Sequence, residues 1–175
     1  MKDTLDIKIR RGEASDGETL CCLINALADN QGLPRPDAEA RLRLKLQAFD
    51  PSSFFDTWLA EVDCQPVGYA ITFYTYSTFL ALPSLHLEDI FVLPEYRLLG
   101  VGKALFTHCA QIALDRNCGR MEWLVLHSNA PAREFYKIFG ANELNEWLLC
   151  RFTREEMRAI AIQATQPHKQ DTNAA

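Results

Sequence analysis

The segment between residues 92 and 103 carries the side chains and glycines best suited to bind an anion. It reads Arg97-x-x-Gly100-x-Gly102-Lys103 and is predicted to join a strand to a helix, where the amides of the first helical turn face outward. The glycines allow the backbone to approach a ligand closely, and the two cations suit phosphate. The pattern alone is equally typical of a tight strand-to-helix turn.

Two other phosphate-binding motifs are excluded at this loop. A Walker loop requires glycine at position 97 and Ser or Thr at position 104, where the chain has Arg97 and Ala104. A dinucleotide-binding fingerprint that starts at Gly100 requires a third glycine at position 105, which is Leu105. What remains is the pattern Arg97-x-x-Gly100-x-Gly102, for which an anion site and a tight turn both stay open.

The elements that position this loop alternate between strands and helices. Period-2 patterns predict strands at 5–9, 55–62, 66–76, 85–92, 121–126 and 146–152. Helical periodicity and capping residues predict helices at about 16–30, 37–46, 101–117, 129–139 and 153–162. This order predicts a mixed α/β fold, one layered sheet with helices on both faces, in a single domain over 1–163 followed by a polar tail over 164–175.

The composition limits the function classes. The chain has 175 residues, of which 48% are hydrophobic, so it can bury one core. Without an 18-residue apolar run or a secretory signal, we expect a cytoplasmic protein. The net charge of −5 disfavours nucleic-acid binding and suits a cationic substrate. The six cysteines show no metal-binding spacing, so we expect buried thiols and no metal.

Three segments together resemble a known family. Leu87–Val92, Tyr96-Arg97 with the glycine loop, and Asn129–Ala141 are similar to the GNAT acetyltransferase superfamily, and in particular to its diamine (spermidine/spermine) N-acetyltransferase branch. The resemblance covers most of the chain from Ile7 to Ile160. It implies a single-domain mixed sheet of about seven strands, acetyl-CoA as co-substrate, and direct acetyl transfer to a primary amine without metal. It also implies a homodimer, since members of this branch dimerise and some exchange their C-terminal strand.

The resemblance assigns roles to individual residues. An amine is protonated at pH 7 and needs a base before it can attack, and the branch places its base at Glu88. Tyr136 would protonate the leaving thiolate, and the amides of Phe91 and Val92 would stabilise the oxyanion if the strand splays open before Pro94. The residues expected to bind acetyl-CoA are Phe91, Val92, Arg97, Leu98, Leu99, Gly100, Val101, Gly102, Lys103, Asn129 and Tyr136.

Taken alone, the same residues have ordinary structural interpretations. Glu88 is then a half-exposed glutamate on a strand or an ion-pair partner, and Tyr136 is a packing residue of a helix. Strand alternation predicts that Asp89 points to the face opposite Glu88 and has a structural role. His86 and His127 lie near strand ends and are able to relay a proton, but their spacing does not separate them from surface histidines.

The substrate side departs from the branch. The residues expected to face the amine are Asn30, Gln31, Tyr76, Glu88 and Asp89. Polyamine enzymes carry an acidic and aromatic pair where this chain has Asn30-Gln31, and a second acid where it has Ser77. The acceptor therefore stays open between a polyamine, a lysine-like amino acid, another small amine and a protein amine. The alternative functions are a CoA-binding module without turnover and an interaction domain that uses the aromatics around 73–79.

Overall fold

The computed structural model describes residues 5–165, and the chain divides into two compact units, 1–126 and 127–175. Each unit is described by itself. The predicted polar tail falls mostly on residues 166–175, which lie outside the described residues. That 1–163 forms a single domain stays a prediction. Among the described helices, none combines the length and the apolar character that a membrane span requires.

The first unit contains a five-stranded mixed sheet whose strands lie in chain order. The strands are β1 (Ile7–Arg11), β2 (Asp56–Val62), β3 (Gln65–Ser77), β4 (Leu82–Val92) and β5 (Arg120–Trp123). The first four pair antiparallel, and β5 pairs parallel to β4. A parallel pair requires a crossover connection, which the helix between β4 and β5 supplies, as predicted.

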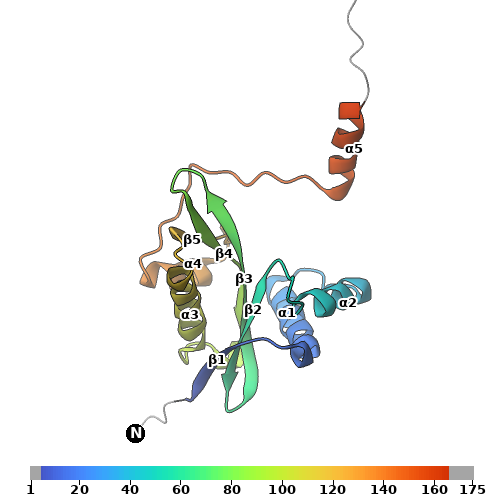
Figure 1. Ribbon diagram of the computed structural model, residues 1–175. Coiled ribbons are helices and arrows are strands. Elements are labelled where there is room, and N and C mark those ends of the chain that lie inside the picture. Colours follow the sequence, from blue (N-terminus) through green and yellow to red (C-terminus); the bar gives the residue numbers. More distant parts are fainter. Residues whose placement is uncertain (1–4, 166–175) are drawn as a thin grey trace, which may run out of the picture. The chain divides into compact units, whose positions relative to one another are not determined.

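Helices cover both faces of this sheet, which confirms the predicted layers (Figure 1). The helices α1 (Gly17–Gln31) and α2 (Ala38–Gln47) lie on one side, and α3 (Val101–Asp115) lies on the other. As predicted, Asp37 caps α2, since its side chain accepts a hydrogen bond from the Ala40 amide. The core on the α1 side contains Leu20, Leu23, Ala48, Leu59, Tyr69, Ile71 and Phe91.

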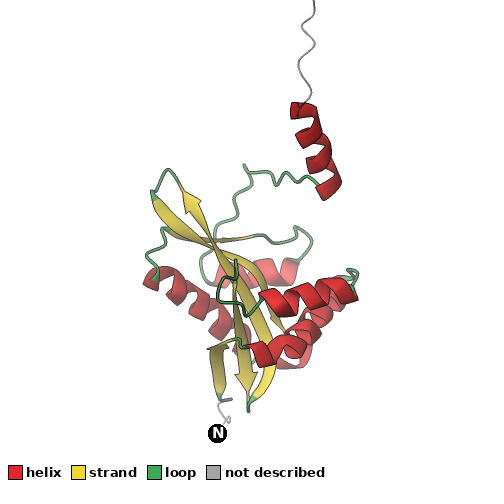
Figure 2. Ribbon diagram, turned by 45° about the vertical axis from the view of Figure 1, so that its right-hand side comes forward, coloured by secondary structure: helices red, strands yellow, loops and turns green. Residues whose placement is uncertain are grey.

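The strands β3 and β4 form a long hairpin that extends past the start of β2 (Figure 2). Their register shifts once, because Ile71 pairs with Asp89 whereas Thr72 pairs with Leu87. Glu88 is therefore the extra residue of a β-bulge. Such a bulge interrupts the alternation of side chains and changes the direction in which they point.

The second unit contains two helices, α4 (Ala130–Ile138) and α5 (Arg154–Thr165). The predicted caps are confirmed. The Asn129 side chain accepts from the Ala132 amide at 3.3 Å, and Thr153 exchanges hydrogen bonds with Glu156 at 2.6 and 3.2 Å.

The predicted strand at 146–152 is wrong, because this segment is irregular and exposed, including Trp147 and Leu148. An apolar, strand-like pattern forms a strand only where a neighbouring strand pairs with it. The described residues hold five strands, not about seven. The expectation of buried cysteines is correct for only two of the six, Cys21 and Cys109, while Cys22, Cys64 and Cys150 are exposed.

Candidate functional site

The loop between β4 and α3 has the backbone conformation that an anion site needs. A short 3₁₀ helix (Pro94–Tyr96) follows β4, and two residues then have positive φ, Leu98 at 62° and Gly100 at 93°. The first hydrogen bond of α3 runs from the Ala104 amide to the Gly100 carbonyl at 2.9 Å. The amides of the first helical turn precede it and face outward, so they are available to a phosphate group.

Arg97 connects this loop with the end of α1. Its Nε donates to the Val92 carbonyl at 3.0 Å, and its Nη2 donates to Asn30 Oδ1 at 3.1 Å. The guanidinium carbon lies 5.5 Å from the centre of the Phe91 ring, within cation–π range. The structure thus brings together Arg97, predicted for the diphosphate, and Asn30, predicted for the amine. Lys103 is exposed in the first turn of α3.

The strand β4 has one open edge where the loop begins. Its pairing with β5 ends at Leu87, so among the described residues of the first unit no strand continues along that edge. The Leu93 amide donates to the Val67 carbonyl of β3 at 2.9 Å, and amide directions alternate along a paired strand. The Val92 amide therefore points to the open edge and the Phe91 amide points to β3. Of the two amides predicted for an oxyanion, Val92 has the suitable direction.

The bulge places Glu88 and Asp89 on the same face of the sheet, so the prediction of opposite faces is wrong. Tyr69 and Phe73 of β3 share one face because strand side chains alternate. The Tyr69 hydroxyl donates to Asp89 Oδ2 at 3.2 Å, and the Phe73 and His86 rings pack with centroids 4.7 Å apart. His86 Nε2 lies 3.7 Å from Glu88 Oε2, so Glu88 lies on this face as well.

The two adjacent acids differ in exposure. The Glu88 side chain is 58% exposed and is able to meet a ligand from solvent. Asp89 is half-buried against Tyr69, and desolvation raises the pKa of its carboxyl, which the hydrogen bond from Tyr69 partly offsets. Of the two carboxylates, Glu88 is therefore the one that a ligand can reach, and Asp89 is the one held by Tyr69.

The second unit carries the remaining predicted cofactor residues. Tyr136, on α4, is only 9% exposed and packs edge-on against Phe135. Burial raises the pKa of the Tyr136 hydroxyl to about 12. The hydroxyl therefore keeps its proton at neutral pH, as a proton donor must. Asn129 is the N-cap of α4, as described above.

The other predicted substrate residues are dispersed. Gln31 ends α1 and is exposed. Tyr76 lies near the end of the β3–β4 hairpin and shares the face of Tyr74, whose ring lies 5.9 Å from the guanidinium carbon of Arg116, the residue after α3. That face is opposite to Glu88. Ser77 is buried and accepts a hydrogen bond from the Leu80 amide, so it stabilises the turn.

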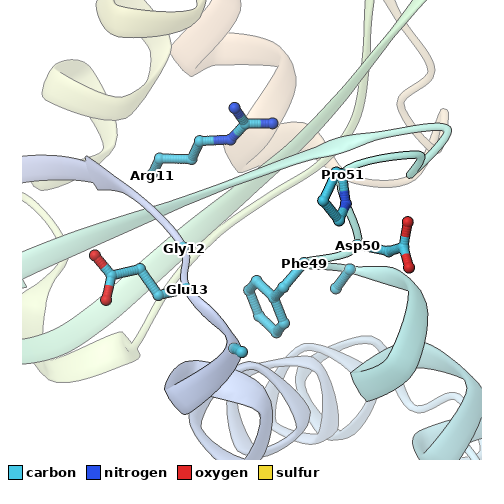
Figure 3. Close-up of a pocket in the computed structure, with 8 residues that line it drawn as sticks. Arg11, Gly12, Glu13, Phe49, Asp50 and Pro51 are labelled. Atoms are coloured by element: carbon cyan, nitrogen blue, oxygen red, sulfur yellow. The ribbon is translucent and has the colours of Figure 1, made fainter.

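A hollow of about 510 Å³ lies elsewhere in the first unit (Figure 3). It is lined by residues 11–14 and 48–51, and Arg11 there pairs with Asp56. The predicted site residues do not line it. Among the described residues, no group of three His, Cys, Asp or Glu side chains is arranged to hold a metal ion.

Sequence reasoning missed the bulge and the His86 contact. A bulge leaves no mark in an apolar/polar pattern as short as Leu-His-Leu-Glu-Asp. The available signal was the pair of adjacent acids, Glu88 and Asp89, inside a strand. Adjacent residues of a regular strand point to opposite faces, so two acids share one face only where the alternation is interrupted.

The chain is similar to known proteins over most of its length. The sequence model of the Acetyltransferase (GNAT) family matches residues 22–141. The chain is 32% identical to the thialysine N-epsilon-acetyltransferase of Bos taurus over 89% of its own length and 97% of that protein. It is 30% identical to the human spermidine/spermine N(1)-acetyltransferase-like protein 1 over 88% of its own length and 24% of that protein.

The fold is also that of solved structures. The aminoglycoside N-acetyltransferase AAC(6')-Iy, solved in complex with CoA, superimposes with a TM-score of 0.70. The match covers 88% of this chain and 99% of that one, at 20% sequence identity. At this identity the likeness establishes the fold.

Proposed function

Because the chain belongs to the acetyltransferase (GNAT) family and acts as an N-acetyltransferase on an amine, we propose that its acyl donor is acetyl-CoA and its acceptor a lysine-like amino acid. The acetyl group passes directly from the thioester to the primary amine. A polyamine is the second candidate acceptor.

One observation carries the proposal: an exposed carboxylate lies beside an open strand edge that ends in an anion-binding loop. Glu88 stands at the bulge, and the Val92 amide points to the open edge a few residues further along β4. The outward amides before Ala104 follow directly. The carboxylate, the outward amide and the helix start follow one another in the order in which amine, thioester and diphosphate would be bound, which supports the proposal.

The chemistry follows from these positions. Glu88 removes a proton from the ammonium group, directly or through one water, which frees the nitrogen lone pair for attack on the thioester carbonyl. The Val92 amide stabilises the oxyanion that forms. The family resemblance assigns to Tyr136 the proton that the leaving thiolate takes up, and the Tyr136 hydroxyl is protonated at neutral pH. Arg97 holds the end of β4 through the Val92 carbonyl.

The choice of acceptor rests on the chain's own residues. Asn30 uses its side-chain oxygen on Arg97, and Ser77 is buried in a turn, so both positions lack a carboxylate for a second ammonium group. A thialysine enzyme matches nearly from end to end. A substrate with one reacting amine and few further positive charges suits this site better than a polyamine.

We further propose a cytoplasmic homodimer. The exposed apolar residues of the second unit, Trp147, Leu148 and Leu149, support the assembly, since exposed apolar segments of this kind commonly mark contacts between chains.

The test measures binding and turnover separately. Acetyl-CoA at about 100 times its Kd should raise the Tm by about 5 to 10 °C, because it binds only the folded state. Release of free CoA thiol is then followed with thialysine, ornithine, spermidine and a lysine peptide. We expect the highest kcat/KM with an amino acid.

The outcomes separate the alternatives. A Tm shift without thiol release for any amine would identify a CoA-binding module that does not turn over. The absence of both would reject the loop as a diphosphate site. Preference for spermidine would keep the reaction and overturn the proposed acceptor.

A further inference from the structure

His86 is the second titratable side chain at the bulge. Its Nε2 lies 3.7 Å from Glu88 Oε2, and its ring is tilted by 35° against the Phe73 ring. The His86 side chain is only 19% exposed, whereas the Glu88 side chain is 58% exposed. The imidazole is thus held by packing, and the more mobile carboxylate is able to reach both the imidazole and solvent.

The surroundings of His86 are mostly acidic. On its own strand, Glu88 and Asp89 share its face, and Tyr69 of β3 donates to Asp89. Glu122 of β5 is the register partner of His86 and pairs with Arg120 at 3.1 Å. A proton on His86 would therefore meet carboxylates on its own strand and on the neighbouring strand β5.

The reaction creates a need that Glu88 alone does not meet. Each turnover leaves one proton on Glu88, and a protonated carboxyl does not act as a base. That proton has to leave before the next ammonium group binds. The bound acceptor occupies the solvent side of Glu88, so a second path inside the site allows the proton to leave without waiting for the product to dissociate.

We propose that His86 is the proton exit of this site: it accepts from Glu88 the proton taken from the ammonium group and passes it to solvent. The N–H bond of the ammonium breaks and an O–H bond forms on Glu88. That proton then moves to His86 Nε2, directly or through one water across the 3.7 Å gap, and finally to bulk water, which restores the neutral imidazole. The inference rests on the proposed role of Glu88 as base.

The first test replaces the imidazole by a group of similar size that does not titrate. His86→Gln should lower kcat about tenfold, less than the loss of a base that contacts the substrate, and leave the KM for acetyl-CoA unchanged. The relay needs the imidazole to take up and release a proton in each turnover, so the pH profiles of kcat for the wild type and for His86→Gln should differ in shape.

Two further variants separate a relay from packing. Imidazole in the buffer should restore kcat to His86→Ala, because it replaces the lost proton carrier. The control is His127→Gln, which makes at an exposed histidine the change that His86→Gln makes at the bulge. Its kcat should stay within about twofold of wild type and should not rise when imidazole is added to the buffer. If His86→Gln fails to fold, His86→Phe keeps a ring against Phe73 without a proton acceptor, and wild-type kcat in that variant would overturn the proposal.

A double variant decides whether His86 acts through Glu88. Glu88→Gln with His86→Gln should be no slower than Glu88→Gln alone, because no proton then needs to leave. Multiplied losses would assign His86 a packing role and overturn the relay. If the wild type acetylates no amine, the proposed function itself fails. If it does, and Glu88→Gln is slow while His86→Gln keeps its kcat and its pH profile, only the relay fails.

Discussion

Two clusters of carboxylates in the first unit differ in whether a cation neutralises them. Around Arg10, the carboxylates of Asp16 and Glu61 accept hydrogen bonds of 2.6 to 2.8 Å from one guanidinium. At the bulge, Glu88 is exposed and Asp89 is half-buried, and the basic side chain beside Glu88 is the His86 imidazole. The first cluster stabilises the N-terminal part of the first unit, whereas the second leaves acidic groups that can take part in chemistry.

The difference shows in the pKa directions of Asp16 and Asp89. The hydrogen bonds from Arg10 hold the pKa of Asp16 below its usual range, although burial opposes them. Burial raises the pKa of Asp89, and the neutral Tyr69 hydroxyl offsets this only in part. A carboxylate that is paired with a cation therefore adds stability in its charged form, whereas one that has no cation beside it reduces stability in that form. Such raised values are typical of functional sites.

The largest expected effect is a loss of turnover when the exposed acid of the bulge is replaced. Glu88→Gln removes the base and keeps the size of the side chain, so kcat should fall by about 100-fold or more. Because the side chain is 58% exposed, the Tm should change little. Steady-state kinetics with saturating acetyl-CoA measures the first, and thermal unfolding measures the second.

The matched control is Glu95→Gln, which makes the same change of charge on the exposed short helix before the loop. Its kcat should stay within about twofold of wild type. A comparable loss in both variants would mean that Glu88 contributes only general attraction of the cationic substrate.

The next prediction is that the same substitution in the two clusters changes the free energy of unfolding in opposite directions. Asp16→Asn should lower the free energy of unfolding at pH 7 by about 2 to 3 kcal/mol, because the charged hydrogen bonds to Arg10 are lost. Asp89→Asn should raise it, because a neutral amide replaces a half-buried charge and still accepts from Tyr69. Urea unfolding of both variants at one pH gives the two signs.

The pH dependence follows the same signs. The folded pKa of Asp16 lies below its unfolded value, so its stabilisation is present above that unfolded value, near 3.9, and is lost as the pH falls through the folded pKa. The folded pKa of Asp89 lies above its unfolded value, so stability is lost as the pH rises from the unfolded pKa to the folded pKa of Asp89. Asp16→Asn should therefore flatten the acid limb of the stability curve, and Asp89→Asn should steepen it. Equal slopes in the two variants would contradict the assignment.

Local signals predicted most of the scaffold. The capping residues Asp37, Asn129 and Thr153 marked helix starts within a residue or two, because a cap is a contact between neighbours in sequence. The glycine loop and its strand-to-helix context were likewise readable. These features depend on a few adjacent residues, which a sequence displays directly.

Features that depend on distant partners were not predictable in the same way. The bulge at Glu88 exists only in the pairing of β4 with β3, and the contact of Arg97 with Asn30 joins residues that are 67 positions apart. The apolar run at 146–152 satisfies a strand pattern, yet the described residues give it no partner strand. Chemistry-bearing residue types were found from the sequence, but their neighbours required the fold.

The smallest expected effect concerns backbone strain at Leu98, in the loop between β4 and α3. Leu98 has φ 62°, and its side chain is fully exposed, so the left-handed conformation costs about 1 to 2 kcal/mol without packing in return. Leu98→Gly removes this strain and adds about 0.5 to 1 kcal/mol of unfolded-state entropy, which leaves a net gain of up to about 1 kcal/mol. Leu99→Gly is the control, since Leu99 does not have positive φ, and it should lose about 0.5 to 1 kcal/mol. Denaturant unfolding resolves the two signs, and a loss for Leu98→Gly would show that the loop holds Leu98 without strain.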